Sequence, residues 1–329
     1  MGESKQMRKY LDAHIVYETK GMDRATWLEI RKSGIGGSDA ASVLGLNPHR
    51  SSISIFMEKV DYIHNAGYKE ENNQDTKDEE VSYRMELGNK LEEFVAREFT
   101  EKTGKKVRNV NGILKNDNYP FALANIDRAV VGEKAFLECK VTNSYSKKVW
   151  ELGVPIHYQI QVNHYMAVTG ATHCYVAALV GNEQLVIHKL ERDEEIINEI
   201  MELEAMFWDK CVLGNNIPAP DGSMDYSKVL QEYYKDSKDE ELILFEEESV
   251  LNRYDEVVEL YRDLELEKKK IEQHLQNQMQ EYEVAFIGDR RISWKQQERK
   301  SIDTKRLKSE LPEIADKYMK TTTSRVFRI

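Results

Sequence analysis

Residues 121–141 constrain the fold more than any other stretch, because they read as two strands joined by a tight turn. Both halves are rich in residues that favour strands. The Gly132-Glu133 pair between them suits a two-residue hairpin loop with glycine first. Such a loop fixes the register and places Asp127 directly opposite Glu138. The sequence therefore predicts a central β-hairpin whose two strands are paired in a defined way.

One face of this hairpin is charged. Cross-strand partners have Cβ atoms roughly 5 Å apart, and alternation along the strand places Lys140 on the same face as Glu138. Leu137, Cys139 and Val141 point the other way, into a core. Two carboxylates held this close repel each other unless a cation lies between them, and such pairs suit Mg²⁺ or Mn²⁺. The pattern favours a metal site for phosphoryl transfer, with the lysine holding or deprotonating the attacking water. Spacing alone leaves an ordinary solvated face as the alternative.

Composition and charge exclude several classes of protein. No run of about 18 apolar residues is present, so no membrane span is expected. The N-terminus lacks the apolar centre of a signal peptide. Cys139, Cys174 and Cys211 are widely spaced, which is typical of a reducing cytoplasm and not of a disulfide framework or a metal cluster. The net charge of −11 argues against a protein that coats nucleic acid, although residues 290–329 carry +7.

The N-terminal part predicts two short helices separated by a glycine-rich turn. Residues 24–32 read as a helix that places Trp27 and Arg31 one turn apart. After the turn, Ser38 is the predicted N-cap of a second helix that Gly45 ends. Helix N-termini bind phosphate readily, and Arg31 could add a fork of donors. Plain capping is the alternative for this segment.

Two longer helices are predicted on either side of the hairpin in the sequence. Residues 86–102 carry an apolar stripe with Glu92 at its boundary. Residues 155–169 place Gln161 and Tyr165 on one face. The stripe of the first helix consists of Leu87, Leu91, Phe94, Val95 and Phe99, and the histidines of the second, His157 and His164, are expected to be packing or surface residues.

The remaining segments complete this part of the chain. Residues 66–83 are polar and charged, and they predict a mobile surface loop. A hairpin that turns at Gly181-Asn182 and a helix over 194–213 follow, before the proline-containing break at 215–220.

About 110 residues follow Pro220 and form a predicted extension. Apolar residues recur near helical spacing over 241–283, which predicts a long amphipathic helix that could form a coiled coil. A hairpin over 284–294 and a helical piece over 304–318 are predicted after it. Whether the long helix packs on its own domain or builds an oligomer remains open. The basic surplus at the C-terminus likewise fits either DNA or the acidic remainder of the chain.

Over residues 22–215 these elements, in this order, resemble the YqaJ-type phage recombination nucleases, relatives of lambda exonuclease in the PD-(D/E)XK superfamily. The matching residues are Trp27, Arg31 and Ser38 (W…R…S), Gly88 and Glu92 (GxxxE), Asp117 and Asp127 (the acidic pair), Glu138-Cys139-Lys140 (ExK), and Gln161 and Tyr165 (QxxxY). Cys139 departs from the aliphatic residue of the family type, which matters little if only its backbone oxygen is used.

The resemblance implies an α/β fold with a mixed central sheet flanked by helices. It divides the chain into an exonuclease domain over 1–222 and a mainly helical extension over 223–329. By analogy, one Mg²⁺ or Mn²⁺ ion is bound by Asp127, Glu138 and the Cys139 carbonyl. Asp117 and Glu92 are expected to hold a second ion or to orient its water ligands.

The resemblance also assigns the other site residues. Lys140 is expected to position the nucleophilic water, and Gln161 to steady Lys140 or the substrate. Arg31 and Ser38 are expected to grip the terminal 5′-phosphate. Trp27 and Tyr165 are supporting residues.

The function implied is a metal-dependent exonuclease on double-stranded DNA in the cytoplasm of a bacterial host. It would degrade 5′ to 3′ and leave a 3′ overhang for a single-strand annealing protein, and the lambda enzyme suggests a homo-oligomeric ring of three subunits. The alternatives are a structure-specific endonuclease or resecting nuclease of the same superfamily, or a non-catalytic DNA-binding assembly subunit. Intact Asp127, Glu138 and Lys140 argue against the last.

Overall fold

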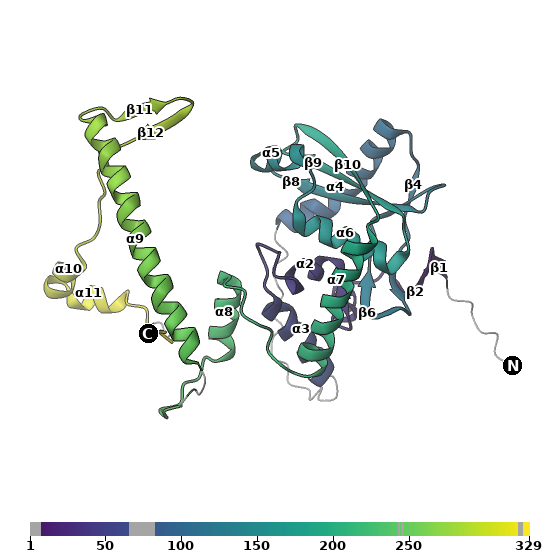
Figure 1. Ribbon diagram of the computed structural model, residues 1–329, viewed down its shortest axis with the longest axis horizontal. Coiled ribbons are helices and arrows are strands. Elements are labelled where there is room, and N and C mark those ends of the chain that lie inside the picture. Colours follow the sequence, from purple (N-terminus) through teal and green to yellow (C-terminus); the bar gives the residue numbers. More distant parts are fainter. Residues whose placement is uncertain (1–7, 66–82, 243, 245–246, 322–324) are drawn as a thin grey trace. The chain divides into compact units, whose positions relative to one another are not determined.

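The computed structural model describes residues 8–65, 83–242, 244, 247–321 and 325–329, which form two compact units, Met1–Tyr233 and Tyr234–Ile329 (Figure 1). The loop predicted over 66–83 lies outside the described residues, apart from Tyr83, which begins a helix.

The first unit extends past the predicted boundary at residue 222 because helix α8 (Met224–Tyr233) belongs to it. Tyr226 of α8 is buried in an apolar cluster with residues of helix α3 (Ser52–Asn65). Beside it, the Asp225 carboxylate accepts hydrogen bonds from the Ser51 amide (2.8 Å) and from the Ser51 and Ser54 hydroxyls (2.7 and 2.6 Å). These contacts attach α8 to the start of α3.

The first unit is α/β, as predicted, but its described strands divide between two mixed sheets instead of one. Their orders are β1-β2-β5-β6-β3 and β10-β9-β8-β7-β4. The pairs β3–β6 and β8–β9 are parallel, and the others are antiparallel. The strands are β1 (Lys9–Tyr10), β2 (Ala13–Glu18), β3 (Ile35–Gly36), β4 (Val107–Arg108), β5 (Gly112–Asn116), β6 (Tyr119–Ala124), β7 (Arg128–Val130), β8 (Ala135–Thr142), β9 (His173–Val180) and β10 (Gln184–Glu191).

The predicted central hairpin is β7 with β8, and its register is confirmed. The paired residues are Arg128 with Leu137 and Ala129 with Phe136. The strands end at Val130 and resume at Ala135, so the connection has four residues and not the predicted two. Gly132 in that connection has φ +85°, a conformation that favours glycine. Asp127 immediately precedes β7, where the chain passes from the first sheet to the second.

Helix α6 (Ile156–Thr169) lies between the two sheets (Figure 1), and its residues from Ile160 to Thr169 are all buried. Its Val162 and Met166 share one core with strand residues of both sheets, such as Leu114 and Val176. Because α6 is covered on all sides, it can hold polar side chains against either sheet without exposing them to solvent.

Helix α4 (Tyr83–Thr103) covers the other face of the second sheet. Val95 and Phe99 pack with Leu137 of β8, and Cys139 and Val141 are partly buried against the same cluster. The predicted inward and outward faces of β8 are therefore confirmed. The remaining elements of the unit are α1 (Arg24–Arg31), α2 (Gly37–Val43), η1 (Ser144–Ser146), α5 (Lys147–Leu152), α7 (Glu194–Met206) and the π-helical η2 (Phe207–Leu213).

His164 is a packing residue, as predicted. Its Nδ1 lies 2.9 Å from both carboxylate oxygens of Glu204 on α7, and its Nε2 lies 3.0 Å from the Leu123 carbonyl. Burial lowers the pKa of His164, but Glu204 and the Leu123 carbonyl raise it above its ordinary value overall. The pair thus joins α6 to α7 and β6 in the interior.

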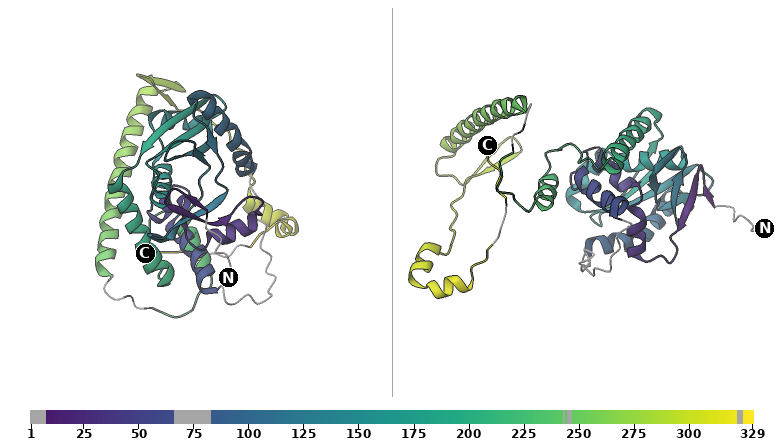
Figure 2. Two further views of the ribbon diagram at one scale, coloured as in Figure 1. Left: turned by 90° about the vertical axis from the view of Figure 1, so that its right-hand side faces the viewer. Right: turned by 90° about the horizontal axis from the view of Figure 1, so that it is seen from below.

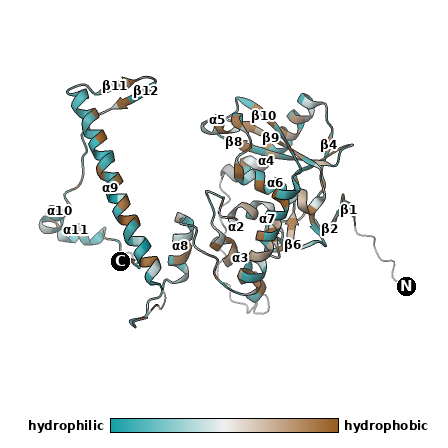
Figure 3. Ribbon diagram, viewed as in Figure 1, coloured by the Kyte–Doolittle hydropathy of each residue, from teal (hydrophilic) through white to brown (hydrophobic). Residues whose placement is uncertain are grey.

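The second unit contains the predicted long helix, α9 (Glu248–Met279), which Figure 2 shows as continuous. Hydrophobic residues recur along it (Figure 3), including Leu251, Tyr254 and Leu264, and these three are exposed. The predicted hairpin follows as β11 (Val284–Ile287) and β12 (Arg290–Ser293), and the predicted helical piece is divided into α10 (Thr304–Glu310) and α11 (Pro312–Lys317). Pro312 explains the break, because proline has no amide hydrogen with which to continue α10. In the described parts of both units, no helix has the length and apolarity that crossing a membrane requires.

Candidate active site

The acidic face of the central hairpin forms a compact polar cluster. The Asp127 carboxylate accepts a hydrogen bond of 2.7 Å from the Cys139 amide, which ties the residue before β7 to β8. Glu138 is 3% exposed, and its Oε1 accepts hydrogen bonds from Lys140 Nζ (2.7 Å) and Gln161 Nε2 (2.8 Å). The structure therefore brings together four residues predicted from sequence, three from the hairpin and one from α6.

Gln161 and Tyr165 lie one turn apart on α6, and Gln161 contacts this cluster directly. Gln161 Oε1 accepts from Lys140 Nζ at 3.2 Å, while its Nε2 also lies 3.3 Å from the Tyr165 hydroxyl. One amide thus fixes the positions of a lysine and a glutamate together. The predicted role of Gln161 in steadying Lys140 agrees with this geometry.

The carboxylates of the cluster are poorly compensated. Burial raises the pKa of Asp127 well above its ordinary value, and Glu138 and Glu92 raise it further. Glu138 Oε2 is buried and has no hydrogen-bond partner in the described structure. A buried carboxylate oxygen without a partner is costly. A divalent cation would satisfy that oxygen and remove the repulsion between the two acids.

The donors available for such an ion are Asp127, Glu138 and the Cys139 carbonyl. Across the described ranges, no set of three or more His, Cys, Asp and Glu side chains is arranged to hold a metal. The candidate donor set is accordingly two carboxylates and one backbone oxygen. Oxygen donors of this kind suit Mg²⁺ or Mn²⁺ better than softer metals.

Lys140 is held as a cation. Burial lowers its pKa, but Glu138 and Asp127 raise the pKa above its ordinary value overall. Its ammonium also lies 4.6 Å from the ring centroid of Tyr158, a favourable cation–π contact. A charged lysine donates hydrogen bonds, and the role of Lys140 in positioning the water stays a prediction.

Glu92 borders the cluster but has a partner of its own. Arg128 donates from Nη1 to Glu92 and from Nη2 to Glu93, the latter at 2.8 Å. Glu92, Asp127 and Arg128 line one pocket of about 270 Å³, together with Thr19, Asn109, Asn111, Gly112, Asn125 and Ile126. The metal-binding role of Glu92 stays a prediction, and Arg128 is a neighbour that no sequence motif indicated.

Asp117 lies apart from the cluster. It sits in the turn between β5 and β6, where the Asn118 amide bonds to Asn116 Oδ1 at 3.0 Å and the chain reverses. Its side chain is 93% exposed and lies 3.8 Å from His14. Asp117 and Asp127 lie at opposite ends of β6, so the structure does not bring Asp117 into the acidic cluster, and its role at a second metal stays a prediction.

A second polar cluster surrounds Asp39 near the start of α2. The helix begins at Gly37 with Gly36 as its N-cap, so the predicted cap, Ser38, is wrong. Asp39, the third residue of the helix, reaches back to this N-cap, because its Oδ2 accepts a hydrogen bond from the Gly36 amide at 3.1 Å. The Ser38 hydroxyl is therefore available to Arg31, whose Nη2 donates to it.

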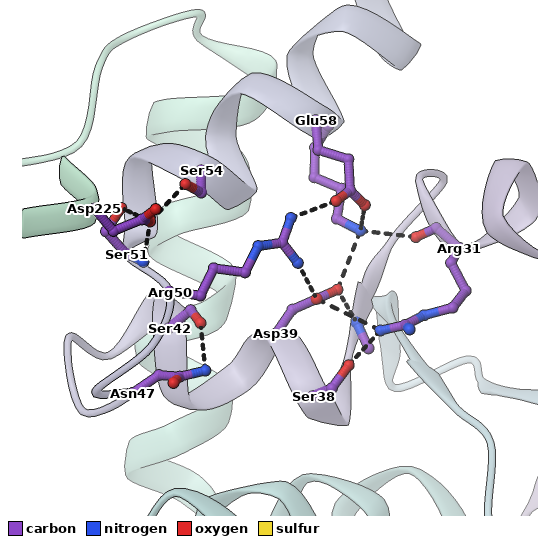
Figure 4. Close-up of polar contacts among 12 residues, drawn as sticks. Arg31, Ser38, Asp39, Ser42, Asn47, Arg50, Ser51, Ser54, Glu58 and Asp225 are labelled. Carbon is purple, nitrogen blue, oxygen red and sulfur yellow. Dashed lines mark hydrogen bonds and ion pairs between the residues drawn. The ribbon is translucent and has the colours of Figure 1, made fainter. Parts of the chain in front are cut away.

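Three cations converge on the buried Asp39 carboxylate (Figure 4). Asp39 Oδ1 lies 3.5 Å from Arg31 Nη2 and 3.3 Å from Arg50 Nη1, and Oδ2 lies 3.1 Å from Lys59 Nζ. Glu58 pairs with Arg50 and Lys59 on the far side. Burial raises the pKa of Asp39, but Arg31, Lys59, Arg50 and the Gly36 amide together lower it to about 2.

The sequence reasoning missed Asp39, Arg50 and Lys59. The position of Lys59 in the sequence could have indicated a buried lysine. It lies four residues from both Ile55 and Ile63 on one helical stripe, where an apolar side chain is expected. A lysine in such a stripe needs a buried acid. No short-range signal pointed to Arg50, which lies in the loop before α3, while its partner Asp39 lies on α2.

The two clusters are joined through α6. A Cβ at Gly37 would lie 2.3 Å from the Tyr165 ring, so only glycine permits this close contact of α2 with α6. Tyr165 in turn contacts Gln161 in the acidic cluster. Trp27 supports the other side, with its ring 4.8 Å from the Arg31 guanidinium. Of the two predicted supporting residues, Trp27 thus contacts Arg31 and Tyr165 contacts Gln161.

Comparison with known proteins identifies the family. Residues 26–172 match the YqaJ-like viral recombinase domain. The uncharacterized protein YqaJ of Bacillus subtilis (strain 168) is 35% identical over 322 residues, which cover 96% of this chain and 97% of that protein. The similarity therefore includes the second unit as well as the first.

Solved structures show more distant similarity. An alkaline exonuclease (LHK-Exo) from Laribacter hongkongensis is 21% identical with a TM-score of 0.46, over 56% of this chain and 91% of its own. A phage related exonuclease from Haemophilus somnus 129PT is 14% identical with a TM-score of 0.41, over 58% and 100%. On the sequence comparisons, the family predicted from the motifs is confirmed, and the chain belongs to the YqaJ-like viral recombinase family.

Proposed function

We propose that this protein is a metal-dependent deoxyribonuclease that degrades double-stranded DNA from a 5′ end. The observation that carries the proposal is the buried Glu138, whose Oε2 has no partner in the described structure, beside Asp127 and the charged Lys140. Membership of the YqaJ-like viral recombinase family supports it.

The residues of the acidic cluster have distinct roles in this proposal. Asp127, Glu138 and the Cys139 carbonyl hold Mg²⁺ or Mn²⁺, and Glu92 borders the place for a second ion. An ion held there would supply the Lewis-acid chemistry that lowers the pKa of a bound water and offsets charge on the phosphate. Lys140 orients the attacking water and stabilises the charge that develops on the phosphate oxygens. Gln161 holds the side chains of Lys140 and Glu138 in place through hydrogen bonds of 3.2 and 2.8 Å.

The Asp39 cluster supports the 5′ polarity. Arg31 presents its guanidinium beside the Ser38 hydroxyl, a pair of groups suited to a terminal phosphate. Three cations and two acids, Asp39 and Glu58, leave the cluster with one net positive charge. The contact chain through Tyr165 links this cluster to Glu138, so a strand whose end is held at Arg31 would pass the acidic face.

The second unit is proposed to assemble the enzyme. The exposed apolar residues of α9, among them Leu251 and Leu264, suit contacts between copies, and a ring of subunits would keep the enzyme on its duplex. The product, a 3′ single-stranded overhang, would serve a single-strand annealing protein as partner.

One experiment tests the function directly. The full-length protein is incubated with Mg²⁺ and either a linear duplex or a covalently closed circle, and acid-soluble nucleotide release is measured beside nicking of the circle. We expect release from the linear duplex alone. Nicking of the circle would instead indicate an endonuclease of the same superfamily. Binding without cleavage of either DNA would overturn the proposal in favour of a non-catalytic subunit.

A further inference from the structure

Arg128 is the residue directly after Asp127, and the hairpin register directs its side chain toward helix α4. Arg128 pairs with Leu137 of β8, and Leu137 packs with Val95 and Phe99 of α4. Cross-strand partners share one face of a sheet, so Arg128 faces the same helix. An acid of the candidate metal site and a cation that faces α4 are thus consecutive in the chain.

Three oxygen atoms hold the Arg128 guanidinium in place. Its Nη1 donates to the Glu92 carboxylate and, at 2.7 Å, to the backbone carbonyl of Asp127. Its Nη2 donates to the Glu93 carboxylate at 2.8 Å. The Arg128 side chain is only 11% exposed, so water competes little for these bonds. Two carboxylates and one backbone carbonyl thus bind this cation, and these are the same kinds of donor that the candidate metal site offers.

Glu92 is the acid that the GxxxE motif assigns to a second metal ion, and Arg128 is already bound to it. Glu92, Asp127 and Arg128 line the same pocket of about 270 Å³. A guanidinium keeps its charge at every pH at which proteins fold, and its hydrogen bonds to carboxylates are among the stronger ones. A second metal ion at Glu92 would therefore have to displace a permanent charge from its partners.

The charges of the site favour one metal ion over two. Glu92, Asp127 and Glu138 carry three negative charges when they are ionised, and Lys140 and Arg128 carry two positive ones. One divalent ion leaves these five side chains with a single positive charge, which a phosphodiester group would neutralise. Two ions would leave three positive charges in a largely buried site, where uncompensated charge is costly.

We propose that Arg128 takes the place of a second metal ion, so that the active site binds one divalent cation and Arg128 supplies the other positive charge. The proposal rests on the function proposed above and deepens it, because it sets the number of ions. Asp127, Glu138 and the Cys139 carbonyl remain the donors for the single ion. Arg128 acts as a positioning residue, since by holding Glu92 it keeps that acid from binding a second ion.

The test counts the ions that the full-length protein binds in the absence of DNA. Mn²⁺ is the probe, and electron paramagnetic resonance of the free ion during a titration gives the number bound per chain. We expect one ion for the parent. Arg128→Met keeps a long side chain but removes the charge, which frees Glu92, so this variant should bind two. Arg128→Met with Glu92→Gln should return to one.

Arg192 supplies a matched control. Its side chain is 20% exposed, pairs with the acid Glu194 and donates to the backbone carbonyl of Met166. Arg192→Met should bind one ion, as the parent does, because an acid freed away from the acidic cluster gains no metal. Circular dichroism should show that the variants are folded.

A second variant tests the inference without disturbing Arg128. If Glu92 is not a metal ligand, Glu92→Gln should bind one Mn²⁺ with an affinity less than about tenfold below that of the parent. A larger loss would overturn the inference, because even outer partners of a metal site contribute tenfold or more. This measurement decides the point if Arg128→Met does not fold.

The remaining outcomes separate this inference from the proposed function. Two ions on the parent would overturn the inference, since Mn²⁺ would then displace the guanidinium. One ion on a folded Arg128→Met would also overturn it, because Arg128 would then only tie β7 to α4. One ion on the parent and two on Arg128→Met, in a protein that releases no nucleotides from DNA, would uphold the inference and defeat the nuclease proposal. No ion on the parent would overturn both.

Discussion

Two carboxylate clusters of the first unit lie in opposite electrostatic surroundings. Asp39 is enclosed by Arg31, Arg50 and Lys59, and its pKa is lowered to about 2 despite its burial. Asp127 is partly buried beside a second acid, Glu138, and its pKa is raised well above the ordinary value. Both clusters are polar, yet the first has three cations for its two acids, whereas the second has Lys140 for the two acids Asp127 and Glu138.

This difference indicates what each cluster is built to receive. The Asp39 cluster is complete in itself and carries a surplus of positive charge, so it can hold an anion such as a terminal phosphate without losing its own contacts. The Asp127 cluster is incomplete, because Glu138 Oε2 has no partner in the described residues. It is therefore suited to a cation. A substrate phosphate and a metal ion are the two charged groups that the proposed metal-dependent hydrolysis would bring together.

The largest expected effect comes from the cation-deficient cluster. Replacing Glu138 by Gln keeps the shape of the side chain but removes half of the carboxylate pair, so Mg²⁺-dependent nucleotide release should fall at least about 10³-fold. The rate is measured with linear duplex, and duplex binding should change little. Glu191→Gln, at an exposed acid on β10, is the control. Activity within a few-fold of the parent would refute the two-carboxylate site.

The cation-rich cluster should respond in stability. Asp39→Asn leaves three cations with Glu58 alone, and unpairing buried charges in this way is expected to lower the free energy of unfolding by about 3 kcal/mol. Urea denaturation of the metal-free protein measures the change. Asp209→Asn, at an exposed position of η2, should cost little. If both variants lose equally little free energy of unfolding, then solvent, and not the Asp39 carboxylate, stabilises the charges of the surrounding cations.

The anion-binding role of the same cluster predicts a preference for phosphorylated ends. The parent should degrade duplex with a 5′-phosphate faster than duplex with a 5′-hydroxyl, and Arg31→Ala should reduce that preference about tenfold, the worth of a charged hydrogen bond. Lys32→Ala removes the neighbouring cation, which pairs only with Glu29 among the described residues, and should keep the preference. If the parent degrades both kinds of end at the same rate, Ser38 and Arg31 have a structural role and do not bind the 5′-phosphate.

What could be predicted from sequence was short-range. The register that opposes Asp127 to Glu138 followed from one glycine-containing turn, because each further pair is then fixed by counting. The contact of Gln161 with Tyr165 followed from their separation of four residues on a helix. The family motifs also predicted that Arg31 and Ser38 act together, and in the structure Arg31 donates a hydrogen bond to the Ser38 hydroxyl.

What could not be predicted depends on long-range packing. Ser38 looked like an N-cap by residue type, but the helix begins at Gly37 with Gly36 as its N-cap, and Asp39 bonds back to the Gly36 amide. Asp117 matched a motif position, yet it lies exposed in the turn between β5 and β6 and is not among the residues that the acidic cluster brings together. Lys59 meets Asp39 only because α3 packs across α2, a contact between helices that spacing within either one does not reveal.

The last prediction uses pH to contrast the two acids, and its effect on stability is the smallest. Asp39 has a lowered pKa, so it stabilises the fold above the ordinary aspartate value of about 3.9 and loses this contribution as the pH falls toward 2.

Asp127 has a raised pKa. Without metal, the folded state therefore retains a proton that the unfolded state has lost, and this acid disfavours folding increasingly as the pH rises through its raised pKa. Asp127→Asn removes that titration but keeps an oxygen for the Cys139 amide and leaves the Lys140–Glu138 pair intact. In EDTA we expect this variant to be more stable than the parent at pH 8, with the difference shrinking as the pH is lowered toward 4. The difference between parent and Asp39→Asn should stay constant over the same range and shrink only below pH 4. Urea denaturation at stepped pH values measures both. Added Mg²⁺ should stabilise the parent but not Asp127→Asn, and a parent that is equally stable with and without Mg²⁺ at pH 8 would contradict the assignment of Asp127 to a metal site.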